Sequence, residues 1–75
     1  MGIDTPVTVY VELTTATSSL TVYCENQLVS WMKSDGDIDT LWLPGGSYLK
    51  AKLGTSTGYR YFTETAKEGL YWTIP

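Results

Sequence analysis

The chain has 75 residues, 43% hydrophobic and 17% charged, which predicts one small domain with enough apolar side chains to fold. It contains no histidine, which excludes Ser–His and Cys–His nucleophilic pairs, histidine general bases and histidine metal ligands. Five Lys and Arg against eight Asp and Glu give a net charge of −3, and no basic cluster is denser than Lys50 and Lys52. A nucleic-acid partner is therefore not expected.

Cysteine content and the apolar runs bear on the compartment. The single cysteine, Cys24, cannot form an internal disulfide, and alternation places it on an apolar face as an inert side chain. The first six residues hold neither a basic nor an apolar segment, so they do not predict a signal peptide. The apolar runs are too short to span a bilayer. We expect one β domain over residues 1–75, in the cytoplasm or a virion, or else a domain of a larger secreted chain.

The first predicted strand shows alternation with a period of two, which is typical of a half-buried β-strand. Its apolar positions are Val7, Val9, Val11 and Leu13. The polar residues between them point to the opposite face. A small polar stretch over residues 15–18 separates this strand from the next one.

A hairpin is predicted around Glu25-Asn26, because two residues suffice for such a turn and Asn tolerates a positive φ. The simplest register then pairs Val22 with Val29 and Leu20 with Trp31 on one face. In the same register Tyr23 meets Leu28 on the other face.

Four more strands are predicted over residues 38–43, 47–53, 59–63 and 70–74. The turn Pro44-Gly45-Gly46 separates the first two of these. In the strand over 47–53, Leu49, Ala51 and Leu53 face inward, while Tyr48, Lys50 and Lys52 face outward. Residues 65–69 form either one helical turn or a loop.

Short strands with turn signals between them favour an all-β fold, a small antiparallel Ig-like sandwich of about six to seven strands. A partly open small β-barrel is the alternative. Two segments resemble parts of PEGA-type β-sandwich modules. Residues 19–29 are similar to their opening hairpin, and residues 41–51, followed by Gly58-Tyr59, are similar to their Pro-Gly-Tyr strand. The resemblance implies a small accessory sandwich with no catalytic residues to carry over.

Few side chains suggest chemistry. Asp35, Asp37 and Asp39 alternate like the start of a calcium loop, but Thr40 and Gly46 stand where an EF-hand needs Gly and Glu. We interpret these aspartates as turn residues and expect no metal and no cofactor.

The four glutamates outside this loop could be imagined as an acid–base pair. However, so short a chain leaves little room for a catalytic cleft, and we expect no enzyme. These glutamates are Glu12, Glu25, Glu64 and Glu68.

The aromatic residues are the most informative feature. Trp31 and Trp72 fall on apolar faces and are predicted to lie in the core. Most tyrosines fall on the opposite faces, with basic residues nearby. Tyrosine at such positions either supports cross-strand neighbours or contacts a partner. The outward tyrosines are Tyr10, Tyr23, Tyr48, Tyr59 and Tyr61, and the basic residues are Lys50, Lys52 and Arg60. The predicted binding surface consists of Tyr48, Lys50, Lys52, Tyr59 and Tyr61.

Three functions fit this surface. The first hypothesis is a non-catalytic structural or interaction protein, a subunit or accessory of a larger assembly such as a phage virion, with a protein partner or a homo-oligomer of itself. The second is a carbohydrate-binding module that uses an exposed Tyr/Trp platform. The third is a single-stranded nucleic-acid binder, which ranks last because the net charge is negative.

Overall fold

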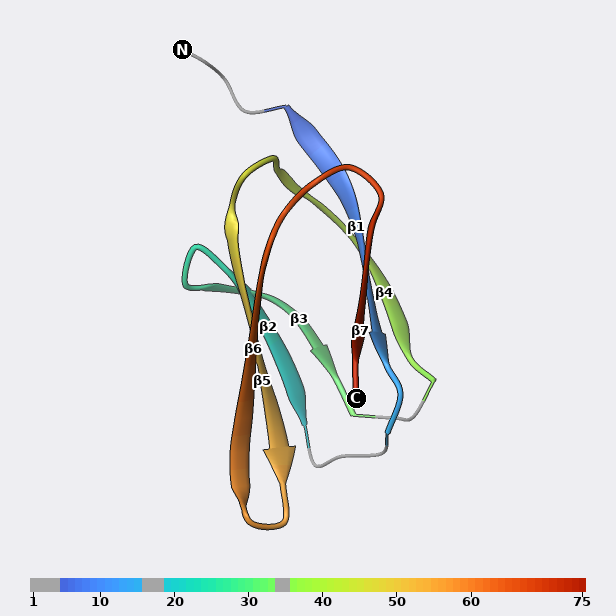
Figure 1. The fold of residues 1–75 in the computed structure, drawn as a ribbon, viewed down its shortest axis with the longest axis vertical. Coiled ribbons are helices and arrows are strands. Elements are labelled where there is room, and N and C mark those ends of the chain that lie inside the picture. Colours follow the sequence, from blue (N-terminus) through green and yellow to red (C-terminus); the bar gives the residue numbers. More distant parts are fainter. Residues whose placement is uncertain (1–4, 16–18, 34–35) are drawn as a thin grey trace.

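The structure, a computed structural model, describes residues 5–15, 19–33 and 36–75, and these residues form seven β-strands. The strands are β1 (Pro6–Leu13), β2 (Leu20–Cys24), β3 (Gln27–Met32), β4 (Ile38–Pro44), β5 (Tyr48–Thr55), β6 (Gly58–Thr65) and β7 (Leu70–Ile74). They divide between a three-stranded sheet of order β4-β1-β7 and a four-stranded sheet of order β3-β2-β5-β6 (Figure 1). The predicted small β-sandwich is confirmed, and the described strands do not form the alternative barrel.

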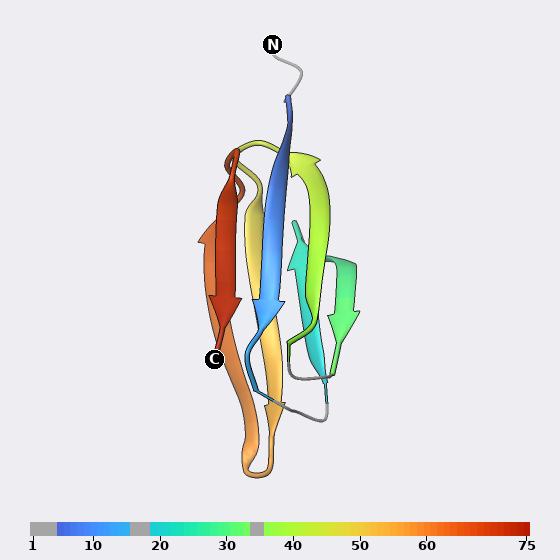
Figure 2. The ribbon, with the colours of Figure 1, turned by 90° about the vertical axis from the view of Figure 1, so that its right-hand side faces the viewer.

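The two sheets pack face to face. The three-stranded sheet lies across the four-stranded sheet (Figure 2), and the Cα atoms extend over 44 × 20 × 14 Å. The strand pairs are antiparallel except for β1 and β7, which run parallel. Each sheet therefore keeps one broad face inside the sandwich and leaves the other broad face exposed.

The core follows from the alternation along the strands. Inward positions of both sheets are apolar and outward positions are mostly polar or aromatic, so pairing the sheets removes the apolar set from water. The predicted inward set of β1 is confirmed, with its first member, Val7, only partly buried, and that of β5 is confirmed throughout. The fully buried larger side chains are Leu13, Leu20, Leu49, Ile74, Val9, Val11 and Val22.

Two turns hold the backbone conformations that their residues favour. Glu25 and Asn26 have φ of 49° and 68°, the left-handed pair that a two-residue hairpin needs, so the predicted turn is confirmed. In the turn between β4 and β5, Gly46 has φ of 87°. A Cβ on Gly45 would lie 3.2 Å from Val7 Cγ1, which explains why the smallest residue stands there.

The hairpin of β2 and β3 departs from the predicted register soon after its turn. Tyr23 lies opposite Leu28, as predicted, whereas Val22 lies opposite Ser30 rather than Val29. Val29 is therefore the extra residue of a β-bulge. The bulge places the Ser30 hydroxyl inside, where it donates a hydrogen bond of 2.6 Å to Asp39 Oδ2 on β4. This bond ties the two sheets together along one side of the sandwich.

The bulge also moves Trp31 from the inside of the sandwich to the outside. Trp31 lies opposite the outward residue Thr21, and Met32 takes the inward position opposite Leu20. Trp31 is 57% exposed, so its predicted place in the core is wrong. The same prediction for Trp72 is confirmed, because that side chain is 8% exposed.

Residues 66–69 carry the chain from the four-stranded to the three-stranded sheet as a loop, and Thr65 ends β6, so the helical turn that was one of two predictions for residues 65–69 does not form. Ala66 anchors this loop, because its N–H bonds to Ser47 O at 2.9 Å and its C=O accepts from Gly46 N–H at 2.8 Å. Gly69 N–H then donates to Thr8 O at 3.0 Å and starts the parallel pairing of β7 with β1. The chain thus closes over the end of the core before its last strand.

The two tryptophans give a direct test of the bulge. Trp72→Ala should lower the free energy of unfolding by about 3–5 kcal/mol, or unfold the protein outright, because it removes a buried aromatic side chain. Trp31→Ala should change it by less than about 1 kcal/mol, because the side chain is largely in water. Urea unfolding of the two variants measures both effects. Equal losses would show that Trp31 belongs to the core after all.

Candidate functional site

The predicted binding residues all lie on the outer face of the four-stranded sheet. Tyr48, Lys50 and Lys52 occupy alternate positions of β5, and Tyr59 and Tyr61 occupy alternate positions of the neighbouring β6. Tyr23 of β2 lies opposite Lys50 and completes the group on the other side of β5. We call this group the Tyr–Lys face: Tyr23, Tyr48, Lys50, Lys52, Tyr59 and Tyr61.

Each lysine of the Tyr–Lys face reaches diagonally across to a tyrosine ring. Lys52 Nζ lies 4.1 Å from the ring centroid of Tyr59, and Lys50 Nζ lies 5.6 Å from that of Tyr61. A cation over an aromatic face is attracted to the ring quadrupole by about 0.5–1 kcal/mol at exposed sites. These contacts hold the ammonium groups close to the sheet without neutralising their charge.

No carboxylate within the described part of the chain forms an ion pair with Lys50 or Lys52. Two glutamates flank this sheet, and both accept backbone hydrogen bonds instead. Glu25 Oε2 accepts from Tyr48 N–H at 2.6 Å, and Glu64 Oε1 accepts from Thr65 N–H at 3.1 Å. The Tyr–Lys face is therefore a positively charged aromatic surface on an acidic protein.

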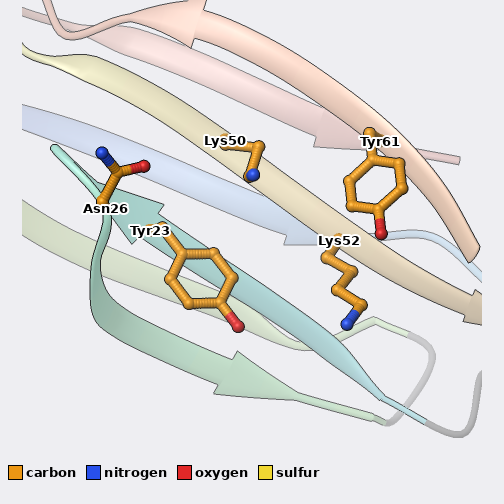
Figure 3. Close-up of a pocket in the computed structure, with 5 residues that line it drawn as sticks. All are labelled: Tyr23, Asn26, Lys50, Lys52 and Tyr61. Atoms are coloured by element: carbon orange, nitrogen blue, oxygen red, sulfur yellow. The ribbon is translucent and has the colours of Figure 1, made fainter.

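A shallow depression lies in the middle of the Tyr–Lys face. It has a volume of about 230 Å³. Figure 3 shows its lining side chains projecting on the same side of the sheet, from β2, the following turn, β5 and β6. These are Tyr23, Asn26, Lys50, Lys52 and Tyr61. Two aromatic rings, an amide and two ammonium groups thus meet around one open hollow, which can contact a ring or an anionic group.

The exposed surface of this sheet continues beyond the predicted residues. Leu28 and Trp31 of β3 are 59% and 57% exposed on the same face, and Lys33 Nζ lies 5.5 Å from the Trp31 ring centroid. Leu28 was expected on this face, opposite Tyr23, whereas Trp31 was not, because the bulge at Val29 reverses the alternation after it. Arg60 does not join the surface as expected, because it occupies an inward position of β6, over the Phe62 ring.

A second aromatic surface covers the outer face of the three-stranded sheet. Tyr10 of β1 lies here rather than with the other tyrosines, beside Tyr71 of β7, with ring centroids 6.0 Å apart. Trp42 and Ile38 of β4 are 70% and 54% exposed on the same face. We call this surface the Trp–Tyr face: Tyr10, Glu12, Ile38, Trp42 and Tyr71. The alternation of β4 and β7 could have predicted it, because both strands place aromatic side chains outward.

The glutamates considered as an acid–base pair are dispersed. Besides the two that flank the four-stranded sheet, Glu68 Oε1 accepts from Thr8 N–H at 3.0 Å and Glu12 Oε1 accepts from Tyr71 Oη–H at 2.8 Å. Each of these carboxylates thus holds a different donor in place.

The aspartates with calcium-like spacing do not form a common site among the described residues. Asp35 lies outside the described residues, and Asp39 accepts the hydrogen bond of Ser30. Among residues 5–15, 19–33 and 36–75, no group of three or more Asp, Glu, Cys or His side chains is placed to hold a metal ion. Cys24 is buried on the apolar face, as predicted.

Comparisons with family models, with curated proteins and with solved structures give no match to this chain. The described residues also contain no helix with the length and hydropathy needed to cross a membrane. The two exposed faces are therefore the features of this protein that bear on its function.

The hydrogen bond that Tyr71 donates to Glu12 predicts a shift in the pKa of Tyr71. Donation to the Glu12 carboxylate, together with desolvation and the charge of that carboxylate, raises the pKa of Tyr71 above its ordinary value. The contribution of this bond to stability is present below the tyrosine pKa of the unfolded chain and is lost as pH rises through the folded pKa. Glu12→Gln should lower the Tyr71 pKa, measured from its ring resonances by NMR. Glu64→Gln is the control, and an unchanged Tyr71 pKa in Glu12→Gln would contradict the assignment.

Proposed function

We propose that this protein is a non-catalytic protein-interaction module that docks a partner on the Tyr–Lys face. The observation that carries the proposal is the gathering of four tyrosines and two unpaired lysines on one sheet face. Tyrosine is enriched in interfaces because it offers a large amphipathic contact area at a low cost in conformational entropy. The arrangement therefore resembles a docking surface more than a solvated sheet face.

Exposure supports this proposal. Tyr48, Tyr59 and Tyr61 are 46%, 60% and 56% exposed, so about half of each residue's surface remains to be covered by a partner. Single exposed apolar residues are normal on a protein surface, whereas contiguous exposed patches mark interaction sites. The two lysines add a preference for a partner with carboxylates at the contact, because opposite charges steer association and fix its register.

The small size of the domain supports a place in a larger assembly. A domain of this size buries only about 60% of the surface that its unfolded chain exposes. Association would cover further apolar surface and would also protect the edge strands β3, β4, β6 and β7. We propose that the protein works as a subunit or accessory of such an assembly, for which a phage virion is our example.

Site-specific photo-crosslinking in the cells that make the protein tests the proposal. A photoreactive phenylalanine analogue at position 61 should yield one protein adduct of defined mass, because it lies on the docking face. The same analogue at position 55, an inward position of β5 near its tip, is the control and should yield little of that adduct. Lys50→Glu with Lys52→Glu should reduce the adduct at position 61 at least tenfold.

The matched control for this charge reversal is Arg60→Glu with Lys67→Glu, which changes the net charge by the same amount away from the face. It should leave the adduct in place. If position 61 gives no adduct, or if both pairs of charge reversals reduce it equally, the proposed docking face is wrong.

The depression favours a second candidate, a carbohydrate ligand. Sugar rings stack on exposed aromatic side chains, and Asn26 and the lysines supply hydrogen-bond donors around Tyr23 and Tyr61. A glycan array should then show binding that Tyr61→Ala lowers at least tenfold and that Tyr71→Ala, on the opposite sheet, leaves unchanged. Absence of any glycan signal with the folded wild-type protein would remove this candidate.

A further inference from the structure

Exposed apolar side chains gather on both broad faces of the sandwich. Within the part of the chain that the structure describes, every exposed large hydrophobic residue stands at an outward strand position. Those of the three-stranded sheet are Tyr10, Ile38, Trp42 and Tyr71, and those of the four-stranded sheet are Leu28, Trp31, Tyr48, Tyr59 and Tyr61. Because the sheets lie back to back across the core, the two surfaces point in opposite directions (Figure 2). One molecule therefore has two separate surfaces to cover.

The two faces carry charges of opposite sign. The outward strand positions described for the four-stranded sheet hold Lys50 and Lys52 and no carboxylate. Those described for the three-stranded sheet hold Glu12 and no cation. Carboxylates also flank both sheets and accept backbone hydrogen bonds there: Glu68 from Thr8 at the three-stranded sheet, and Glu25 and Glu64 from Tyr48 and Thr65 at the four-stranded sheet. The difference in sign therefore comes from the outward strand positions. Two copies of the same face therefore repel each other, whereas the two different faces attract each other.

We propose that a second copy of this chain docks on the Tyr–Lys face and presents its Trp–Tyr face to it. This inference depends on the proposed function, because it names the partner of the same docking face. Trp42 and Tyr71 of one copy would cover the tyrosines of the next, and the Glu12 carboxylate would approach Lys50 and Lys52. Aromatic contact supplies the buried apolar area, and the charges select this pairing over the alternatives.

Charge also decides the symmetry of the contact. A two-fold symmetric dimer would bring two identical faces together, lysines against lysines or carboxylates against carboxylates, which is unfavourable. Contact between unlike faces is heterologous, so each copy keeps one face for a further neighbour. Such copies form a ring if the rotation between them closes and a filament if it does not. A chain with two unlike aromatic faces is thus suited to repeated stacking.

The faces approach the size of an ordinary contact. The sheets stack along the 20 Å dimension of the molecule (Figure 1), so each broad face lies in the plane of the 44 Å and 14 Å dimensions of the Cα trace. A specific interface of ordinary size buries about 800 Å² on each partner, which would use most of such a face together with the side chains at its rim.

A charge exchange between the faces tests this inference. Sedimentation velocity of the purified wild-type chain should show mass rising beyond a dimer with concentration, or a closed ring larger than a dimer. Glu12→Lys with Thr73→Lys makes the Trp–Tyr face positive, and Lys50→Glu with Lys52→Glu makes the Tyr–Lys face negative. Each double variant alone should associate at least tenfold more weakly than wild type, because like charges then meet. An equimolar mixture of the two should regain association, because every contact in it pairs opposite charges.

The controls separate this inference from the proposed function. Arg60→Glu with Lys67→Glu should associate like wild type, and circular dichroism should show that each variant keeps its β-structure. A wild-type chain that stays monomeric up to millimolar concentration overturns the inference, and so does assembly that stops at a dimer or a mixture that fails to regain it. A crosslinked adduct containing a different protein, with no self-association, overturns the inference and leaves the proposed docking face intact.

Discussion

Burial on one side of β5 fixes what lies on its other side. Leu49, Ala51 and Leu53 are at most 3% exposed, so β5 cannot slip by one residue without moving three apolar side chains into water. Tyr48, Lys50 and Lys52 therefore stand outward whatever their own preferences. Because β5 lies between β2 and β6, its register also sets which tyrosines flank the lysines. The Tyr–Lys face is thus a consequence of the core, and a substitution that disturbs the core alters the face as well.

The cation–π contacts explain how two lysines can remain unpaired at this position. An exposed ion pair adds little stability, and here the two glutamates that flank the sheet, Glu25 and Glu64, bond to backbone N–H groups instead. The tyrosine rings hold the lysine side chains in place while their charge stays available. Under the proposed function, less side-chain entropy then remains to be lost on binding, which favours tight contact. Rings and cations therefore work as one surface, in which the rings orient the charges.

The sequence predicts the core better than it predicts the surface, for a physical reason. Alternation in β1 and β5 marks inward residues directly, and the Glu25-Asn26 turn follows from the backbone conformations that Asn tolerates. The bulge at Val29 has no comparable signal, because Val, Ser and Trp are all acceptable on either side of a strand. Its position depends on contacts made across the sandwich, where Ser30 meets Asp39. The error at Trp31 is therefore an error of register, which begins at the bulge and leaves the predicted outward position of Leu28 correct. The PEGA-type resemblance stays a prediction, as does the setting in a larger assembly.

The distribution of aromatic residues connects the fold to association. Among the described aromatic residues Trp72 is buried, Phe62 and Tyr23 are partly buried, and the other core side chains carry no aromatic ring. Large rings supply the most apolar area per side chain, so a small domain selected for its own stability alone would place them inside. Here most of them lie on two opposite faces, where they add little to the stability of an isolated molecule. Their apolar area becomes favourable only when another surface covers it. The aliphatic core and the exposure of the rings are thus two aspects of one arrangement, and under the proposed function the area of the rings would contribute to binding rather than to folding.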